Sequence, residues 1–160
     1  MEERKLPKLL VSREEAKEKI QERIDEGQRL RDQPIDSEVG LDIVGKEAIN
    51  WSKFNTDLLI RLFDNLSLKN EYENLSYYKF SDYEIETRGV MGWGIPDLNE
   101  HVDFYKENMT NSIYSLEGIR DRLELFEEPD PPERIFGDKI FIVHGHNEGA
   151  NTKSQGSLRP

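Results

Sequence analysis

Three long stretches of the chain carry apolar positions at the spacing of an α-helix. The first has one narrow apolar stripe between charged and amide side chains, formed by Ala16, Ile20, Ile24 and Leu30. Ser12 precedes this stripe and Glu15 follows three residues later, which is the pattern of a capping box. Proline disfavours helical geometry in the residue before it. We therefore predict a helix that begins at Ser12 and ends before Pro34.

The second stretch has a broader apolar face. Its seam recurs at alternating intervals of three and four residues and consists of Leu41, Val44, Ala48, Trp51, Asn55, Leu58 and Leu62. A further row widens the seam, namely Ile49, Phe54, Leu59 and Phe63. Because Trp51 lies on the seam, we predict that it packs in the core rather than serving as a stacking platform for a ligand. Gly40 and Gly45 disfavour helix, so we expect this helix to fray or to start late.

The third stretch is the longest. Its stripe consists of Leu98, Val102, Tyr105, Met109, Ile113, Leu116, Ile119, Leu123 and Phe126. Asp97 and Glu100 are placed for a second capping box. The pattern predicts a helix of about eight turns, or roughly 45 Å. Since a helix of this length needs a partner, we expect it to pack antiparallel against the second helix, with the first alongside.

Residues 66–95 lose the helical period and are rich in aromatic side chains. We predict a short helix near residues 68–75, followed by an irregular or extended stretch. Gly92, Gly94 and Pro96 mark the end of this stretch as a loop. The aromatic residues lead us to expect a packed cover over the helices.

The charge and composition of the chain argue against several classes of function. The 160 residues include 22 basic and 33 acidic side chains, and the net charge of −11 argues against nucleic-acid binding. We interpret the many charges of the first helix as a solvated face. No apolar run is long enough to span a membrane, and the absence of cysteine excludes disulfides, cysteine-ligated metals and a thiol nucleophile. We expect a soluble, cytoplasmic protein without a metal site.

A proline-rich segment then divides the chain. Three prolines fall within residues 129–132 and favour an extended connector. We predict a helical domain over residues 1–128, a linker over residues 129–137 and a separate segment over residues 138–160. Residues 139–143 form a continuous apolar run, which is typical of a strand buried on both faces of a sheet. The polar residues after it would lie where open α/β sheets bind ligands.

The run from Lys139 to Glu148, Lys-Ile-Phe-Ile-Val-His-Gly-His-Asn-Glu, resembles the opening strand and loop of bacterial TIR-like domains, which are described as predicted nucleotide-binding proteins. Residues 10–16 and 51–59 resemble the N-terminal region of some of these proteins. The resemblance implies a flavodoxin-like α/β fold whose competent members cleave a nicotinamide dinucleotide, often in antiphage defence. It also implies that the loop after the first strand borders the nucleotide, and this loop corresponds to His144, Gly145, His146, Asn147 and Glu148.

In that family the catalytic glutamate comes from a later helix, which this sequence does not include. Residues 149–160 have no helical period, so we hypothesise a frameshift or premature stop that leaves a truncated TIR-like domain with an aberrant tail. The predicted fold is mainly α, a long antiparallel hairpin or three-helix bundle followed by one strand. We expect no catalytic residue, no cofactor and no hydrolysis of nicotinamide dinucleotide by this chain, although NAD is the substrate of full-length relatives.

Two functions from different classes stay open at this point. The chain is either the regulatory or assembly module of a TIR-like NAD-cleaving effector, or a free-standing helical module for protein interaction. Self-association through the second and third helices is compatible with both. An intramolecular core would use the same apolar seams, so the sequence does not show whether these seams pack within one chain or between two chains.

Overall fold

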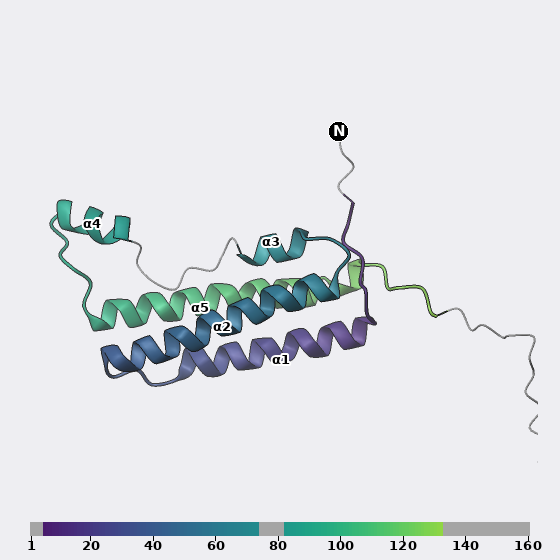
Figure 1. Cartoon of the computed structure of the whole chain (residues 1–160), viewed down its shortest axis with the longest axis horizontal. Helices are drawn as coiled ribbons and strands as arrows, with labels where there is room; N and C mark the ends of the chain where they lie inside the picture. Colours follow the sequence, from purple (N-terminus) through teal and green to yellow (C-terminus); the bar gives the residue numbers. More distant parts are fainter. Residues whose placement is uncertain (1–4, 74–81, 133–160) are drawn as a thin grey trace, which may run out of the picture. The chain divides into compact units, whose positions relative to one another are not determined.

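The computed structural model describes residues 5–73 and 82–132. The chain divides into two units, residues 1–129 and residues 130–160, and the described helices all lie in the first. Its main elements are three long helices, α1 (Arg13–Asp32), α2 (Glu38–Leu62) and α5 (Leu98–Asp121), which lie side by side as a bundle (Figure 1). The prediction of a mainly α fold is confirmed for this part of the chain. The predicted strand lies outside the described residues.

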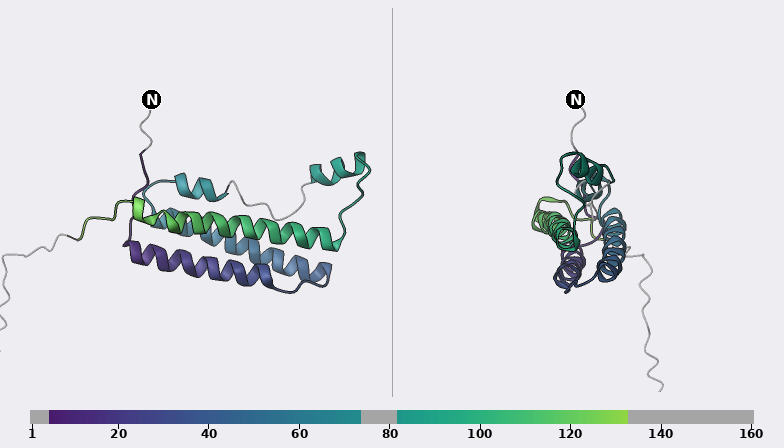
Figure 2. Two further views of the ribbon diagram at one scale, coloured as in Figure 1. Left: turned by 180° about the vertical axis from the view of Figure 1, so that it is seen from behind. Right: turned by 90° about the vertical axis from the view of Figure 1, so that its left-hand side faces the viewer.

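The direction of the helices differs from the prediction in one respect. α1 runs antiparallel to both α2 and α5, so that α2 and α5 are parallel to each other (Figure 2). The hydroxyl of Tyr105 near the start of α5 donates to the carbonyl of Leu30 near the end of α1, over 3.1 Å. The expected antiparallel pairing of α2 with α5 is therefore wrong. The connection over residues 63–97 is long enough to return the chain to the end where α2 begins.

The first helix follows the prediction closely. Its predicted stripe is buried, and Gly27 is buried with it. The hydroxyl of Ser12 accepts from the backbone N–H of Glu15 over 3.2 Å, as in the predicted capping box, but the Glu15 carboxylate pairs with Lys19 and does not complete the box. The helix ends at Asp32, two residues before Pro34, as predicted.

The second helix starts earlier than expected. It begins at Glu38, because the hydroxyl of Ser37 caps it by accepting from the N–H of Gly40 over 3.1 Å. The prediction of a late start is therefore wrong, and both glycines lie within the helix. Trp51 is buried as predicted, and Leu59 joins it in the core, but Phe54 is 55% exposed. Only part of α2 faces its neighbours, so the outer members of its wide apolar face stay in solvent.

The third long helix begins with the predicted capping box. Asp97 and Glu100 each accept from the other's backbone N–H, over 2.9 and 3.0 Å. It ends at Asp121, and a 3₁₀ turn, η1 (Leu123–Leu125), follows in place of the last predicted turn. The Phe126 ring lies beyond η1 and packs edge-on against Phe63, with ring centroids 5.5 Å apart.

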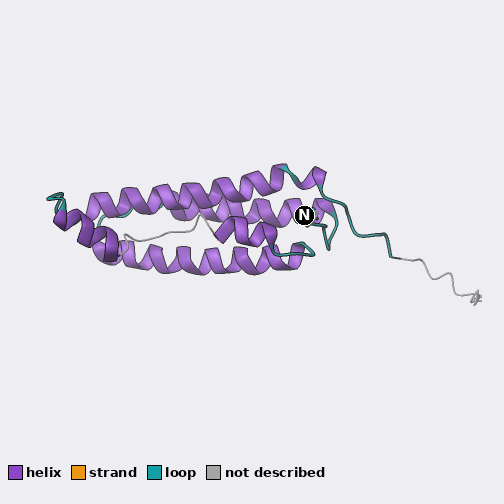
Figure 3. Cartoon of the chain, turned by 90° about the horizontal axis from the view of Figure 1, so that it is seen from above, coloured by secondary structure: helices purple, strands orange, loops and turns teal. Residues whose placement is uncertain are grey.

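The described residues between α2 and α5, which leave out residues 74–81, contain two short helices. The predicted short helix is present as α3 (Ser67–Glu73), with Tyr72 fully buried. A second helix, α4 (Asp82–Val90), replaces the expected irregular stretch, because these residues include several helix formers and no proline (Figure 3). None of the described helices is long and apolar enough to cross a membrane.

Candidate functional site

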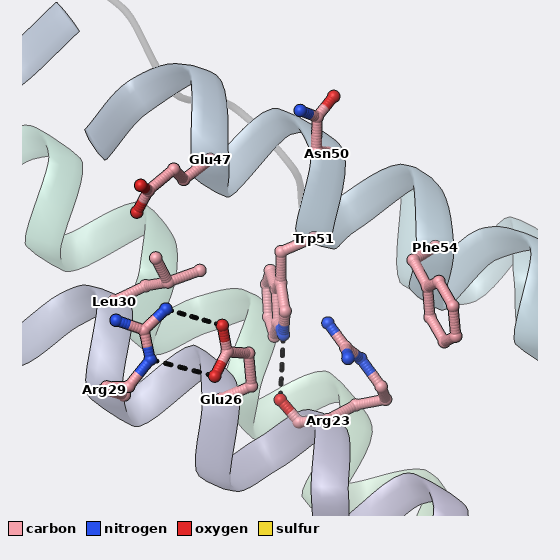
Figure 4. Close-up of a pocket in the computed structure, with 8 residues that line it drawn as sticks. All are labelled: Arg23, Glu26, Arg29, Leu30, Glu47, Asn50, Trp51 and Phe54. Carbon is pink, nitrogen blue, oxygen red and sulfur yellow. Dashed lines mark hydrogen bonds and ion pairs between the residues drawn. The ribbon is translucent and has the colours of Figure 1, made fainter. Parts of the chain in front are cut away.

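A groove of about 330 Å³ lies between α1 and α2 (Figure 4). Each helix contributes four residues at helical spacing, so that one face of each helix lines it. The lining residues are Arg23, Glu26, Arg29 and Leu30 from α1, and Glu47, Asn50, Trp51 and Phe54 from α2. We name it the α1–α2 groove.

The floor of the groove depends on a close approach of the two helices. Trp51 is 3% exposed, and its indole N–H donates to the backbone carbonyl of Arg23 over 2.8 Å. Opposite the ring stands Gly27, where a Cβ atom would come within 2.5 Å of Trp51 Cζ2. The indole is therefore a fixed part of the interface, and only its edge reaches the groove.

Arg23 is the central cation of the groove. Its Nε donates to Oδ1 of Asn55 over 2.9 Å, and its guanidinium carbon lies 4.5 Å from the ring centroid of Phe54. Figure 4 shows the guanidinium between the Trp51 indole and the Phe54 ring. Within the described part of the chain, Arg23 forms no ion pair with a carboxylate.

A buried polar network supports this arginine from below. Nδ2 of Asn55 donates to the hydroxyl of Tyr72 over 2.9 Å, and that hydroxyl donates to Oγ of Ser52 over 3.3 Å. The network links α1 to α3 through α2. Asn55, the one polar residue of the predicted seam, is thus satisfied rather than stranded in the core.

The other charges of the groove are of both signs. Arg29 donates two hydrogen bonds to Glu26, over 2.9 and 2.6 Å, and these lower the pKa of the Glu26 carboxyl and raise the pKa of Arg29. Glu47 lies on the opposite rim. Burial lowers the pKa of the Arg23 guanidinium, and the carboxylates of Glu26 and Glu22 oppose this shift. Arg23 is therefore a half-buried cation, and Glu26, the carboxylate that opposes the shift most, is already bonded to Arg29.

A second feature stands at the connection between α4 and α5. Val90, Met91, Trp93 and Ile95 are each between 61% and 83% exposed, and we call residues 90–95 the apolar loop. Positive φ angles of 75° at Gly92 and 74° at Gly94 turn its backbone. Arg88 holds it from the side by donating to the carbonyl of Gly94 and to the Glu100 carboxylate. The expected packed cover over the helices is therefore wrong for this loop.

The groove and the apolar loop are both suited to recognition. The groove holds no Ser, Thr or Cys nucleophile beside a base, and the described ranges contain no cluster of three His, Asp or Glu residues that would hold a metal ion. An arginine with an aromatic neighbour is suited to binding an anion or a planar group.

The sequence-predicted site lies elsewhere in the chain. His144, Gly145, His146, Asn147 and Glu148 all fall outside the described residues, so their role as nucleotide-binding residues stays a prediction. Sequence reasoning missed Arg23 because the charges of the first helix were interpreted together as a solvated face. A signal was present in Asn55, since a polar residue on a core seam requires a partner.

Comparison of the chain with protein-family models, with curated proteins and with solved structures finds no significant match.

Proposed function

We propose that the helical unit is an assembly module, in which the apolar loop of one copy packs against the apolar loop of a second copy. The observation that carries this proposal is the exposure of Trp93, which is 68% exposed between three other large apolar side chains. Contiguous apolar patches beyond a few hundred Å² are rare on monomers and mark interaction sites.

The composition of the loop favours a second copy as its occupant. No charged residue lies between Gly89 and Pro96, while the whole chain carries a net charge of −11. A two-fold contact places the same patch of both copies face to face, so like charges would be apposed almost anywhere else on the surface. The apolar loop avoids that repulsion.

The area of the loop is consistent with a dimer contact. The four large side chains of the loop are each at least 61% exposed, which gives an apolar surface on the order of 300–600 Å², the size of the patches that are often functional on a monomer. A stable interface buries about 800 Å² on each partner. Val39 and Ile43 expose further apolar surface at the start of α2, which lies at the same end of the bundle as α4 (Figures 1 and 2).

Sedimentation equilibrium of the full chain tests this proposal. Over about 1–500 μM the wild type should change from monomer to dimer, and Trp93→Ser should weaken the association at least tenfold, as expected for a central aromatic anchor. Phe54→Ser is the matched control, because it removes an exposed aromatic ring outside the loop and should associate like the wild type. A wild type that stays monomeric throughout, or two variants with equal effects, would contradict the proposal.

The resemblance of residues 139–148 supports a second candidate function. In it, the helical unit is the regulatory or assembly module of a cytoplasmic TIR-like protein that cleaves NAD in bacterial antiphage defence. Deleting the helical region from a full-length TIR-like relative should then lower its rate of nicotinamide release, and an unchanged rate would argue against this role.

A further inference from the structure

Arg23 differs from the other arginines of the described helices. Six of them form an ion pair with a carboxylate, namely Arg13, Arg29, Arg31, Arg88, Arg120 and Arg122. Arg23 and Arg61 form none within the described ranges, and Arg61 is exposed at the end of α2. In a chain with 33 acidic residues against 22 basic ones, a half-buried arginine without a directly paired carboxylate is a cation whose desolvation is only partly offset.

The guanidinium is held in a fixed position before any ligand arrives. Asn55 accepts from its Nε, and Phe54 lies beneath its plane. These contacts leave the terminal nitrogens for a further acceptor, and a planar arginine fork matches the two oxygens of a carboxylate. Because little side-chain freedom is left to lose, binding there would cost less entropy than at a mobile surface arginine.

The surroundings of Arg23 discriminate between anions. Glu26 and Glu47 line the same groove, so a dianionic phosphate would meet stronger repulsion than a singly charged carboxylate. The ring of Phe54, which is 55% exposed, offers apolar contact beside the cation, whereas Leu30 and Trp51 are almost fully buried. A ligand that fits both features carries one carboxylate with an apolar group next to it.

We propose that the α1–α2 groove binds an acidic side chain of a partner peptide, whose carboxylate pairs with Arg23 while a neighbouring apolar side chain covers Phe54. The site is separate from the apolar loop and does not depend on self-association. Asn55 and Tyr72 also connect the site to α3, so binding in the groove should change the environment of α3.

The two tryptophans of the chain make a site-specific test possible. In a ¹⁵N-labelled chain at fixed protein concentration, the indole N–H of Trp51 reports on the groove and that of Trp93 on the apolar loop. The first probe is a blocked tripeptide with glutamate between leucine and phenylalanine. The matched probe carries glutamine in place of glutamate. N-acetyl-phenylalanine and inorganic phosphate test a terminal carboxylate and a phosphate as other sources of the anion.

The glutamate peptide should shift the Trp51 indole and Arg23 Nε signals saturably, with half-saturation on the order of millimolar for so small a ligand, and leave Trp93 unchanged. The glutamine peptide should bind at least tenfold more weakly. Arg23→Gln should abolish the shift of Trp51, whereas Arg61→Gln, which removes an exposed arginine at the end of α2 outside the groove, should retain it. If Arg23→Gln does not fold, the two peptides on the wild type decide the question.

Other outcomes would overturn the proposal. Equal shifts with both peptides would show that the carboxylate is not recognised, and tighter binding of phosphate would assign the groove to a different anion. Tighter binding of N-acetyl-phenylalanine would contradict an acidic side chain as the occupant and assign a chain terminus. The absence of a saturable shift with every probe would leave Arg23 with a structural role only.

Discussion

The two tryptophans of the chain occupy opposite environments, and glycine is adjacent to both. Trp51 is buried between α1 and α2, where Gly27 leaves space for its ring. Trp93 stands in solvent between Gly92 and Gly94, whose positive φ angles shape the turn. In the first region the missing side chain lets two helices approach, and in the second it lets the backbone bend. The first arrangement stabilises the fold, and the second displays apolar surface.

The largest difference between the two regions should appear on removing each indole. Trp51→Ala should lower the free energy of unfolding by about 3–5 kcal/mol, because it leaves a cavity and removes the hydrogen bond from the indole to the Arg23 carbonyl. Trp93→Ala should change it by less than about 0.5 kcal/mol in the monomer. Urea unfolding at low protein concentration measures both, and similar losses in the two variants would show that the environments are wrongly assigned.

The free energy of unfolding should be nearly as sensitive to a change at Gly27, which lies opposite Trp51. Gly27→Ala gains helix propensity, yet its methyl group overlaps the indole, so we expect a net loss of about 1–3 kcal/mol. Gly118→Ala in α5 is the matched control, since a Cβ there meets nothing within 4 Å. The control should be neutral or stabilising by up to about 1 kcal/mol. Thermal unfolding that shows Gly27→Ala to be neutral would contradict the close approach.

A smaller effect is expected from the polar network beneath Arg23. Tyr72→Phe removes the acceptor of the Asn55 amide and the donor to Ser52, so it should cost about 1–2 kcal/mol. Tyr114→Phe changes an exposed hydroxyl and should be close to neutral. Denaturant unfolding of the two variants compares them directly, and equal stabilities would mean that the network adds nothing to the fold.

The smallest expected effect is that of salt concentration on the association of two copies. Each copy carries a net charge of −11, so screening should favour contact between two uncharged loops. We expect the dimer to tighten a few-fold between about 20 mM and about 300 mM salt, as the Debye length falls from about 20 Å to about 6 Å. Weaker association at high salt would indicate that opposite charges hold the copies together.

The features predicted correctly from the sequence are those that depend on neighbours along the chain. The caps at Ser12 and Asp97 and the stop before Pro34 are local signals, and α1 and α5 begin and α1 ends as they predict. The direction of α5 against α2 was predicted wrongly, because it depends on the path of the connection rather than on the pattern within either helix.

The groove and the apolar loop could not be predicted, because they depend on contacts between residues far apart in the sequence. In the sequence, Arg23 looks like any other charged residue on a solvated helix face. Only the packing of α1 on α2 places it beside Asn55 and Phe54. Trp93 was expected in a packed cover because aromatic residues are usually buried. Its exposure follows from the absence of a large packing surface around a glycine-rich turn.

A dilution series observed at the two indole N–H signals tests the central claim most directly. Between about 500 μM and about 10 μM protein, the Trp93 signal should move along one saturable curve, because this side chain leaves the contact between copies as they separate. The Trp51 signal should stay fixed, since its hydrogen bond to Arg23 lies within one copy. If Trp93 does not move, or Trp51 moves in its place, the apolar loop is not where copies of this chain meet.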